Sequence, residues 1–525
     1  MENLKGDRGQ RAQLESELSV LLFLVVVTLS LGAIVDPDLP GHVAYGLDHL
    51  RSGQLQRTDP YSYSALGDAW VNHEWVFELT SAWVFMRLGG GGLVALQAFA
   101  WSATGALVLW RLRKGSRDLV PGAILYLLFA ALAFAAITIR PQLFTYLLFA
   151  VLLVCLEEAR GGRLWTLAAA GSLFALWVNL HGGFLAGLGV IGLYTLGLLL
   201  DAALKRGAPG DQEAPPARPW LLFGLAAAAC FAGAALTLAN PYGMGLHAFL
   251  VESLGRPRPM IGEWRGVAFD AQGVLFLLAI VGVFVAVWRR RSQTPAAHLA
   301  VLAVTAALGV RHARHVPFFA IAACMFASGA VAALYRRYVP PPEADLDPRA
   351  IQRLRALYVV VLVPALALSL AWPQRDTLSL RLRPVGNSTF PTGALVYMDQ
   401  VNLEGNVLCD FDWAQLVIWR HHPRVHVFYD GRFRTVYSAA IEEAYFDFVA
   451  PLPTPAWRRA LDDWKTEWVL IPAGSPAAAR MHEQPDWRVA YQDRQAVLFT
   501  KRITGEVAPE PVLGEPLPEL PFEPR

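Results

Sequence analysis

Long apolar stretches fill the first 372 residues of the chain, and short polar loops separate them. Each stretch is about 16 to 20 residues long, the length of helix that crosses the hydrocarbon core of a bilayer. Eleven such stretches can be placed, at 17–35, 92–111, 119–138, 142–157, 164–180, 184–203, 220–239, 273–289, 296–311, 316–335 and 354–372. The pattern therefore predicts a mainly α-helical, polytopic membrane domain over residues 1–372.

The segment 74–88 is nearly apolar enough to be counted as a further span. Counting it would move the basic loop 111–117 to the other side of the membrane. Glu78 and Arg87 also argue against a crossing, because each would cost roughly 2.5 to 3.5 kcal/mol at the centre of a spanning helix. We therefore expect 74–88 to form an interfacial or re-entrant helix.

Basic residues fall in alternate loops, which fixes the predicted orientation because short cytoplasmic loops accumulate Lys and Arg. These residues are Lys5, Arg8, Arg11, Arg111, Arg113, Lys114, Arg117, Arg160, Arg163, Lys205, Arg206, Arg289, Arg290, Arg291, Arg336 and Arg337. The N-terminus is then cytoplasmic. The segments 36–91, 240–272 and everything after 372 are extracytoplasmic.

The pattern changes after residue 372 to short alternating runs, such as RVHVFYD and TEWVLIPA, between helical stretches at 411–420 and 440–449. Period-two runs of this length predict strands, so residues 373–503 are predicted to form a small extracytoplasmic α/β domain. Residues 504–525 are rich in Pro and Glu. That composition is typical of a disordered tail.

Composition agrees with a membrane protein, since only 17% of the 525 residues are charged and 55% are hydrophobic. A soluble chain is about a quarter charged. The net charge of +2 gives no field that would attract a nucleic acid, so no nucleic-acid partner is expected. Cys155, Cys230 and Cys324 lie in apolar stretches and Cys409 stands alone, which excludes a disulfide scaffold and a thiolate metal cluster.

Ionisable residues gather where the first span ends, with Asp36 and Asp38 followed by His42, His73 and Glu74. A carboxylate at the edge of low dielectric is costly unless it is paired or used, and it can act as a general base. The alternative is that these aspartates form a turn and a helix start. The catalytic interpretation is favoured for Asp38, and the two interpretations are balanced for Asp36.

Six motifs in order resemble the GT-C superfamily of glycosyltransferases, and in particular its bacterial polytopic members. They are the aspartates after the first span, Asp59-Pro60-Tyr61-Ser62, His73-Glu74-Trp75, Arg140-Pro141-Gln142-Leu143, Trp177-Val178-Asn179-Leu180-His181-Gly182-Gly183 and Asn240-Pro241-Tyr242-Gly243. A departure from the superfamily is Leu39-Pro40-Gly41, where such relatives often carry aromatic residues.

The resemblance implies a catalytic base in the first outer loop and a donor sugar carried on polyprenyl phosphate. We assign the base to Asp38, with Asp36 second, and expect His42, His73, Glu74, Asn179 and His181 to bind substrate. His181 also fits an ordinary turn residue. The resemblance further implies a bacterial cytoplasmic membrane.

A lipid phosphate that leaves needs cationic partners, and Arg grips phosphate oxygens with paired donors. Arg311, His312, Arg314 and His315 lie together at a predicted outer end, where basic residues should be scarce. Phosphate binding is favoured there over contacts with lipid headgroups. For Arg140, at another outer end, phosphate contact and a simple boundary role are equally supported.

No metal site is assigned, and no cofactor is certain. Glu263 and Trp264 could hold Mg or Mn, but Arg256, Arg258 and Arg265 surround them instead of further oxygen ligands. In the C-terminal domain, Phe411-Asp412-Trp413 and Tyr429-Asp430-Gly431-Arg432 suit either sugar binding or an ordinary core and turn.

The sequence therefore predicts an inverting membrane glycosyltransferase that acts on a polyprenyl-phosphate-linked sugar at the outer face of the membrane. Its acceptor is an unidentified glycan, lipid or protein. One alternative is a transporter or flippase, which would need ionisable groups near the bilayer midplane. Another is a non-catalytic membrane scaffold with a glycan-binding domain.

Overall fold

The chain divides into two compact units in the computed structural model. The membrane unit comprises Met1–Gly32 and Ala95–Arg375, and the α/β unit comprises Ala33–Val94 and Asp376–Arg525. The structure describes residues 2–31, 36–115, 118–204, 218–254, 265–339 and 390–501, with 352, 356, 359, 360, 512 and 513 in addition. Each unit is described below by itself.

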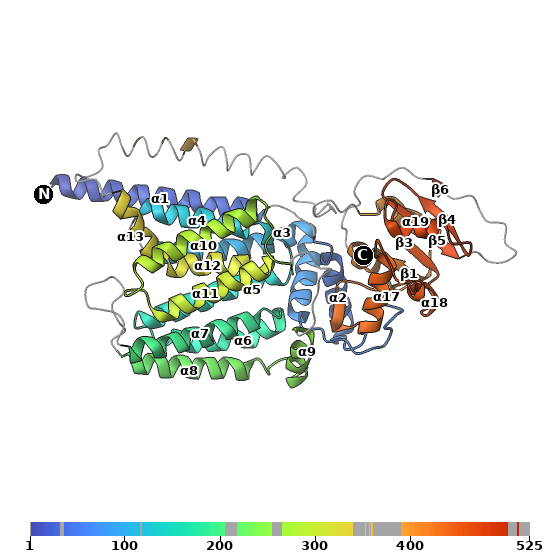
Figure 1. The fold of residues 1–525 in the computed structure, drawn as a ribbon, viewed down its shortest axis with the longest axis horizontal. Helices are drawn as coiled ribbons and strands as arrows, with labels where there is room; N and C mark the ends of the chain where they lie inside the picture. Colours follow the sequence, from blue (N-terminus) through green and yellow to red (C-terminus); the bar gives the residue numbers. More distant parts are fainter. Residues whose placement is uncertain are drawn as a thin grey trace. The chain divides into compact units, whose positions relative to one another are not determined.

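The membrane unit is a bundle of helices that lie side by side, drawn from blue to yellow in Figure 1. Its helices are α1 (Glu2–Ser30), the second part of α3 (Trp75–Gly115), α4 (Leu119–Ala133), η1 (Phe134–Ala136), α5 (Gln142–Arg160), α6 (Thr166–Leu180), α7 (Phe184–Ala203), α8 (Pro219–Leu236), α9 (Met244–Leu254), α10 (Ala271–Arg289), α11 (Ala296–Arg311), η3 (Ala313–His315), α12 (Val316–Phe326) and α13 (Ser328–Tyr338).

Helices occupy the positions of the first ten predicted spans, and the eleventh, 354–372, lies almost wholly outside the described residues. Within the described part of the chain, seven helices are long and apolar enough to cross a membrane. The pair α12 and α13, bent by 67°, would make an eighth. The prediction of a polytopic, mainly helical membrane protein is confirmed.

Small residues allow the membrane helices to approach one another closely. A Cβ at Gly197 of α7 would lie 2.8 Å from the Cβ of Ala297 on α11. A Cβ at Gly171 of α6 would lie 3.0 Å from the carbonyl oxygen of Ala229 on α8. In a bilayer the hydrophobic effect does not drive helices together. Close packing at small residues contributes to their association instead.

Helix α3 is broken at Gly89, which has φ 62° and ψ −158°. A positive φ of this size is readily adopted only by glycine. The segment 74–88, for which we predicted a separate interfacial helix, is thus helical from Trp75 and set off from the rest of α3 by this break. Its depth in the membrane stays a prediction.

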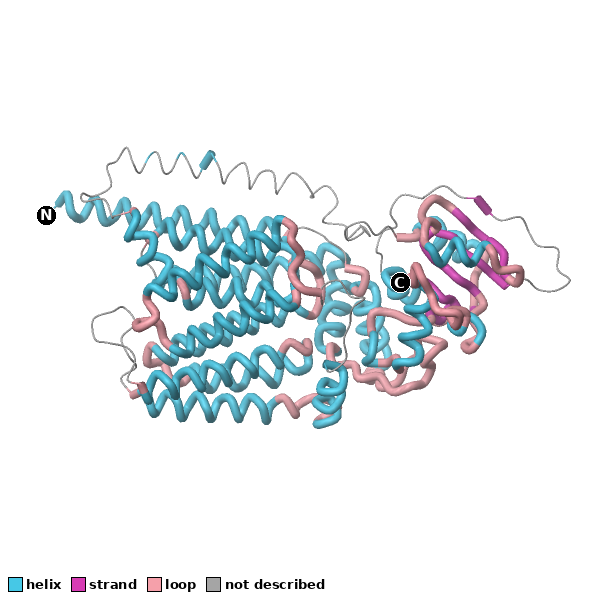
Figure 2. Tube along the Cα trace, viewed as in Figure 1, coloured by secondary structure: helices cyan, strands magenta, loops and turns pink. Residues whose placement is uncertain are grey.

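The α/β unit carries the strands, shown in magenta in Figure 2. Its elements are α2 (Leu39–Ser52), α15 (Thr392–Gln400), β1 (Gly405–Cys409), α16 (Phe411–His421), β2 (Val425–Val427), η4 (Phe433–Thr435), α17 (Ala439–Val449), α18 (Arg459–Asp462), β3 (Trp468–Pro472), α19 (Pro476–His482), β4 (Trp487–Gln492), β5 (Ala496–Lys501) and β6 (Val512–Leu513). The strands form one sheet in the order β2-β1-β3-β5-β4-β6.

Strands β2, β1 and β3 are parallel, whereas β5 pairs antiparallel with both β3 and β4. Strands β2, β3, β4 and β5 and helices α16 and α17 lie where the alternating and helical runs predicted them. Strand β1 was not among the predicted runs, and β6 lies in the segment predicted to be a disordered tail. The buried residues of β1 and β3, such as Leu408 and Leu470, form the core beneath the helices. The predicted tail 504–525 lies outside the described residues except for β6.

The first polar loop of the chain extends this sheet at its β2 edge. The backbone N–H of Val427 donates to the carbonyl of Tyr61 over 3.1 Å, and the N–H of Tyr63 donates to the carbonyl of Val427 over 3.0 Å. A little further on, the N–H of Val71 donates to the carbonyl of Thr435 over 2.9 Å. The loop thereby covers an exposed strand edge. We had grouped 36–91 with the membrane domain, and the boundaries at 372 and 503 stay predictions.

Candidate active site

Asp38 is the residue that precedes the first turn of α2. Its backbone N–H donates to Asp36 Oδ1 over 3.0 Å, so the buried Asp36 carboxylate closes the turn that leads into the helix. Within the described residues, the Asp38 side chain makes no capping hydrogen bond to α2. The turn role considered for Asp36 is therefore seen, while the Asp38 carboxylate is directed elsewhere.

The Asp38 carboxylate lies over Gly431, in the loop after β2. A Cβ at Gly431 would overlap Asp38 Oδ1 and would lie 2.5 Å from Nε2 of Gln415. Asp38 is thus placed against α16 and the β2 loop, both from the C-terminal half of the chain.

His42 follows one turn later on α2 and faces a second carboxylate. Its Nδ1 lies 3.6 Å from Glu78 Oε1, and its ring meets Phe77 edge-on at 5.3 Å. Burial favours the neutral imidazole, but the Glu78 carboxylate and the charges of Glu74 and Asp38 outweigh it, so the pKa of His42 is raised. The imidazole is therefore stabilised in its charged form.

Glu78 is a residue whose place in the site we did not predict. It is buried and accepts a hydrogen bond from Asn72 Nδ2 over 2.6 Å. Glu78 argued against a membrane crossing because a carboxylate in an apolar helix costs free energy unless it is paired. For the same reason, Glu78 in an apolar helix also indicates a functional site.

His73 and Glu74 lie just before α3, next to Asn72. His73 Nε2 is 3.8 Å from Glu74 Oε1, and the backbone N–H of Glu74 donates to Asn72 Oδ1 over 3.3 Å. Through Asn72 they adjoin the Glu78 carboxylate that faces His42. The structure thus brings the predicted residues of the first loop together around the starts of α2 and α3.

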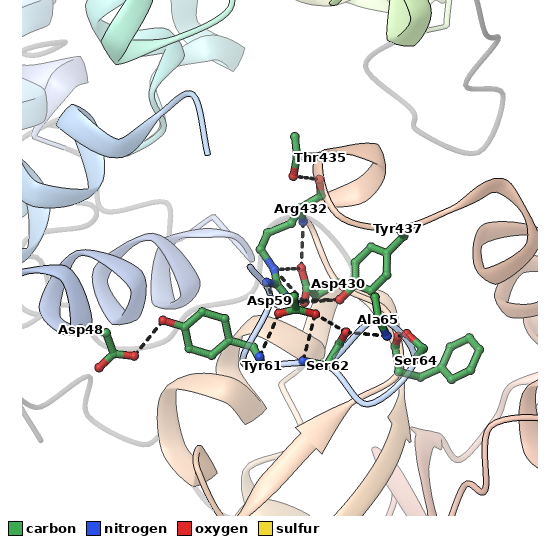
Figure 3. Close-up of polar contacts among 11 residues, drawn as sticks. Asp48, Asp59, Tyr61, Ser62, Ser64, Ala65, Asp430, Arg432, Thr435 and Tyr437 are labelled. Atoms are coloured by element: carbon green, nitrogen blue, oxygen red, sulfur yellow. Dashed lines mark hydrogen bonds and ion pairs between the residues drawn. The ribbon is translucent and has the colours of Figure 1, made fainter. Parts of the chain in front are cut away.

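A buried ionic network centred on Arg432, which we call the Arg432 network, lies in the same unit (Figure 3). Arg432 donates to Asp430 Oδ2 over 2.7 Å and to Asp59 Oδ1 over 2.5 Å. The Tyr437 hydroxyl donates to Asp430 Oδ2 over 2.6 Å. Asp59 in turn accepts from the backbone N–H of Tyr61 over 2.8 Å.

Four aromatic rings surround the Arg432 guanidinium, with centroids at 5.0 to 5.7 Å from its carbon. They belong to Tyr45, Tyr61, Trp70 and Tyr437. Burial opposes the charge, but Asp430 and Asp59 hold the pKa of Arg432 well above its ordinary value. Arg432 is therefore a fixed cation that ties the first loop to the C-terminal strands.

Burial excludes the sugar-binding interpretation of the Tyr429-Asp430-Gly431-Arg432 segment. Tyr429 and Asp430 are both 0% exposed, and Arg432 is engaged as described. The alternative that this segment belongs to the core is the one the structure shows. Trp413 is also buried, whereas Phe411 and Asp412 are partly exposed.

In the membrane unit, four of the five residues predicted to bind phosphate lie together from the end of α11 to the start of α12. Arg311 ends α11 and is exposed, and the rings of His312 and His315 meet edge-on at 5.6 Å. The Tyr146 hydroxyl donates to the carbonyl of Arg314 over 3.1 Å. Arg311 and Asp38 belong to different units, so their predicted cooperation stays a prediction.

The remaining predicted residues lie at a helix end or in turns of the membrane unit. Asn179 Nδ2 donates to the carbonyl of Ala239 over 2.8 Å. His181 Nδ1 accepts from the backbone N–H of Gly183 over 3.0 Å, which suits the turn role considered for it. The backbone N–H of Arg140 donates to the carbonyl of Thr138 over 3.0 Å in the turn before α5. Their roles toward substrate stay predictions.

A second buried ionic network, which we call the Glu157 network, joins four helices of the membrane unit. Glu157 of α5 accepts from Tyr194 of α7 over 2.7 Å and pairs with His298 of α11 over 2.7 Å. Arg111 of α3 donates to its other oxygen. We had assigned Arg111 to a cytoplasmic loop and had not predicted these contacts.

Among the described residues, no three His, Cys, Asp or Glu side chains are arranged to hold a metal ion. Glu263, Trp264, Arg256 and Arg258, considered above for a metal site, lie outside those residues.

No family model matches the chain, and no curated protein matches it in sequence. Solved structures do match. The oligosaccharyltransferase AglB from Archaeoglobus fulgidus, in complex with an inhibitory peptide and a dolichol-phosphate, has a TM-score of 0.55 and 12% identity, over 87% of this chain and 69% of that chain. ArnT from Cupriavidus metallidurans, bound to undecaprenyl phosphate, has a TM-score of 0.51 and 13% identity, over 95% of this chain and 99% of that chain.

A further structure of the Archaeoglobus fulgidus oligosaccharyltransferase, in complex with Zn and sulfate, has a TM-score of 0.50 and 11% identity, over 86% of this chain and 68% of that chain. At such identities the likeness concerns the fold alone. It agrees with the order of motifs from which the resemblance was drawn. The chain is a multi-pass membrane protein whose fold is similar to the folds of AglB and ArnT.

Proposed function

We propose that the protein is a membrane glycosyltransferase that moves a sugar from polyprenyl phosphate to an acceptor at the outer face of the bacterial cytoplasmic membrane. The observation that carries the proposal is the Asp38 carboxylate, which precedes α2 without capping it, in a chain with the GT-C fold. Two proteins of this fold were solved with dolichol-phosphate or undecaprenyl phosphate. This supports a lipid-linked donor.

In the proposed reaction, Asp38 takes the proton of an acceptor hydroxyl or amide as a general base. The acceptor atom attacks the anomeric carbon from the face opposite the lipid phosphate, the bond to that phosphate breaks, and the configuration inverts. Arg311 and Arg314 stabilise the charge on the departing phosphate, with Arg140 as a further contact. Asp36 supports the turn that carries Asp38.

Substrate contacts are proposed for two groups of residues. His42 pairs with Glu78, and His73 and Glu74 adjoin the same carboxylate through Asn72. Asn179 and His181 stand at the end of α6. A divalent cation remains part of the proposal, since a protein of this fold was solved with Zn and sulfate. The sugar and the acceptor are not assigned.

The decisive experiment is Asp38→Asn in the full-length protein, reconstituted with a polyprenyl-phosphate lipid extract from the source membrane. Release of free polyprenyl phosphate measures transfer. Asp38→Asn should abolish release while expression and binding of added undecaprenyl phosphate stay near normal, because only an ionised carboxylate can take the proton. Asp36→Asn should be milder. Full release by Asp38→Asn would refute Asp38 as the base, whereas no release by the unchanged protein would favour a transporter or scaffold.

The phosphate assignment is tested by binding of undecaprenyl phosphate to purified protein. Arg311→Ala and Arg314→Ala should weaken binding, at least one by roughly tenfold, because a charged phosphate contact is lost. Arg289→Ala, at a predicted cytoplasmic end, is the matched control. Equal losses in all three variants would show that these arginines bind headgroups in general.

The proposed orientation puts the N-terminus in the cytoplasm and the C-terminal domain outside. A cysteine at Ser475 should react with an impermeant thiol reagent in intact cells. A cysteine at Ser116, which lies outside the described residues, should not. Labelling at Ser116 would mean that 74–88 crosses the membrane.

A further inference from the structure

The Gln415 side chain of α16 occupies a narrow space between two glycines. Gln415 is 2% exposed. A Cβ at Gly41 of α2 would overlap its Oε1, and a Cβ at Gly431 would lie 2.5 Å from its Nε2. Any other residue at either position would therefore exclude the observed conformation of this amide.

Asp38 points to the same place. The Cβ that Gly431 lacks would lie within 2.5 Å of both Asp38 Oδ1 and Gln415 Nε2, so the carboxylate and the amide share the space that this glycine leaves. An amide N–H can only donate and an ionised carboxylate can only accept. The Gln415 amide is therefore placed beside the carboxylate with a group that can donate to its ionised form.

The other end of the amide shows that stability alone does not explain Gln415. Among the described residues, Gln415 Oε1 and the Tyr45 hydroxyl are buried without a hydrogen-bond partner. A buried polar atom without a partner lowers stability, so a hydrophobic residue of similar size would suit the core better. Gln415 therefore lowers the stability of the core. Its amide nitrogen lies beside the space that Asp38 Oδ1 also enters.

We propose that Gln415 is a positioning residue for Asp38, and that Gly41 and Gly431 are glycines because the amide must pass between them. The inference rests on the proposed function in that it takes Asp38 as the base. It also explains the departure noted in the sequence, since an aromatic residue at Gly41 would fill the place of the amide. The C-terminal domain thus orients the carboxylate of the first loop.

Other charged groups face Asp38 and bear on any test of its protonation. Asp36 accepts from the Asp38 backbone N–H, and the negative charge of Asp38 acts on His42, which pairs with Glu78 of α3. The variants below leave these groups unchanged. A shift in the protonation of Asp38 can then be assigned to Gln415.

The test measures protonation of Asp38 without a substrate. The full-length protein in detergent is treated with dicyclohexylcarbodiimide, which reacts with protonated carboxyls, and labelling of Asp38 is followed against pH by peptide mass spectrometry. Gln415→Leu should move the midpoint up by about one pH unit, because a leucine side chain cannot donate to the carboxylate. The melting temperature should stay the same or rise.

Two further variants separate positioning from a general disturbance. Gly41→Ala should shift the midpoint when Gln415 is present and should have no effect in the Gln415→Ala background, because the clash is then absent. Thr466→Val removes a different buried polar contact of this unit, to Tyr63 over 2.6 Å. It should lower the melting temperature and leave the midpoint in place.

Where transfer can be assayed, Gln415→Leu should lower kcat, leave KM unchanged and move the acid limb of the pH–rate profile in the same direction. An unchanged labelling midpoint in Gln415→Leu overturns the inference, even if Asp38→Asn abolishes transfer. A shifted midpoint together with an active Asp38→Asn variant supports the contact and refutes the proposed base instead. The two failures are therefore distinguishable.

Discussion

The Arg432 network and the Glu157 network both bury one charge among opposite charges and a tyrosine, but they differ in what they join. Arg432 and its hydrogen-bonding partners come from loops, and Asp59 lies 373 residues from Arg432 in the chain. Glu157 and its partners all lie on helices that pack side by side in the membrane unit. Helices fix one another's rotation through such contacts, whereas the first loop depends on Arg432 for its place on the sheet.

The surroundings of the two charges differ as well. The Arg432 guanidinium is enclosed by aromatic rings, which suit it because it is planar and weakly hydrated. Glu157 is satisfied by hydrogen bonds alone, and one partner, Arg111, retains 13% exposure of its side chain. Loss of Arg432 should therefore leave charges more completely stranded than loss of the Glu157 charge.

The largest effect is expected from Arg432→Met. This change leaves Asp59 and Asp430 buried without their cation, which should cost about 3–5 kcal/mol of folding free energy. Thermal unfolding in detergent, with hydrogen exchange in peptides from 58–72, measures it. Arg434→Met is the matched control, since Arg434 pairs with a partly exposed Glu442 and should cost about 1 kcal/mol. Equal losses of folding free energy in the two variants would show that the Arg432 network stabilises the fold no more than a partly exposed ion pair does.

Glu157→Gln should have the second largest effect. The amide oxygen can still accept from Tyr194, but the amide NH2 cannot accept from Arg111 and the charge is lost. About 2 kcal/mol should therefore be lost, seen as faster hydrogen exchange in α5. Glu158→Gln is the control, because its partners Lys114 and Arg163 are 47% and 65% exposed and the pairs are screened. A loss as large as that of Arg432→Met would remove the contrast between the networks.

The tyrosine hydroxyls should contribute alike in both networks. The Tyr437 hydroxyl donates to Asp430 over 2.6 Å, and the Tyr194 hydroxyl donates to Glu157 over 2.7 Å. Tyr437→Phe and Tyr194→Phe should each cost about 1 kcal/mol in thermal unfolding, because each removes one hydrogen bond to a carboxylate. If one variant unfolds at the same temperature as the unchanged protein, that hydroxyl does not donate to the carboxylate in solution.

The Asp410 carboxyl, which precedes α16, offers an effect that depends on pH. Burial and the charge of Asp412 raise the pKa of Asp410 to about 7. Because the folded pKa lies above the ordinary value of about 3.9, the protonated acid stabilises the fold at low pH and this contribution is lost as pH rises toward about 7. Asp410→Asn should flatten the fall in melting temperature between about pH 4 and pH 7. Asp412→Asn should keep this fall but move it to lower pH, because one charge that raises the pKa of Asp410 is removed. An unchanged slope in Asp410→Asn would contradict the raised pKa.

The sequence predicted elements whose pattern is local. Apolar runs such as 119–138 became α4, and the run WRVAYQDRQAVLFTK became β4 and β5, because burial on one face or within a span leaves a period that can be counted. The same local pattern allowed a core and turn to be predicted as one of the two alternatives for the segment that contains Asp430. Turn chemistry before α2 was likewise recognised as one of the two roles of Asp36.

Contacts between distant segments could not be predicted in this way. The sequence around Asp59 does not indicate that its ion-pair partner is Arg432, because no spacing rule relates two loops that are 373 residues apart. Arg111 and Glu157 were counted as residues at the ends of spans, where position in the chain says nothing of the partner on a neighbouring helix. Gln415 gave no signal at all, because a lone glutamine on an amphipathic helix has no pattern to mark it.

The pairing of Tyr61 and Tyr63 with Val427 has a consequence for biogenesis. Translation at about 5 to 20 residues per second separates the emergence of Asp59 from that of Arg432, 373 residues later, by roughly 20 to 75 s. During that interval the first loop has been made, but the strand and the cation that order it have not. Ribosomes that stop before residue 432 would release a membrane-inserted chain whose first loop stays unfinished, so completion of the polypeptide itself is the step that assembles the site.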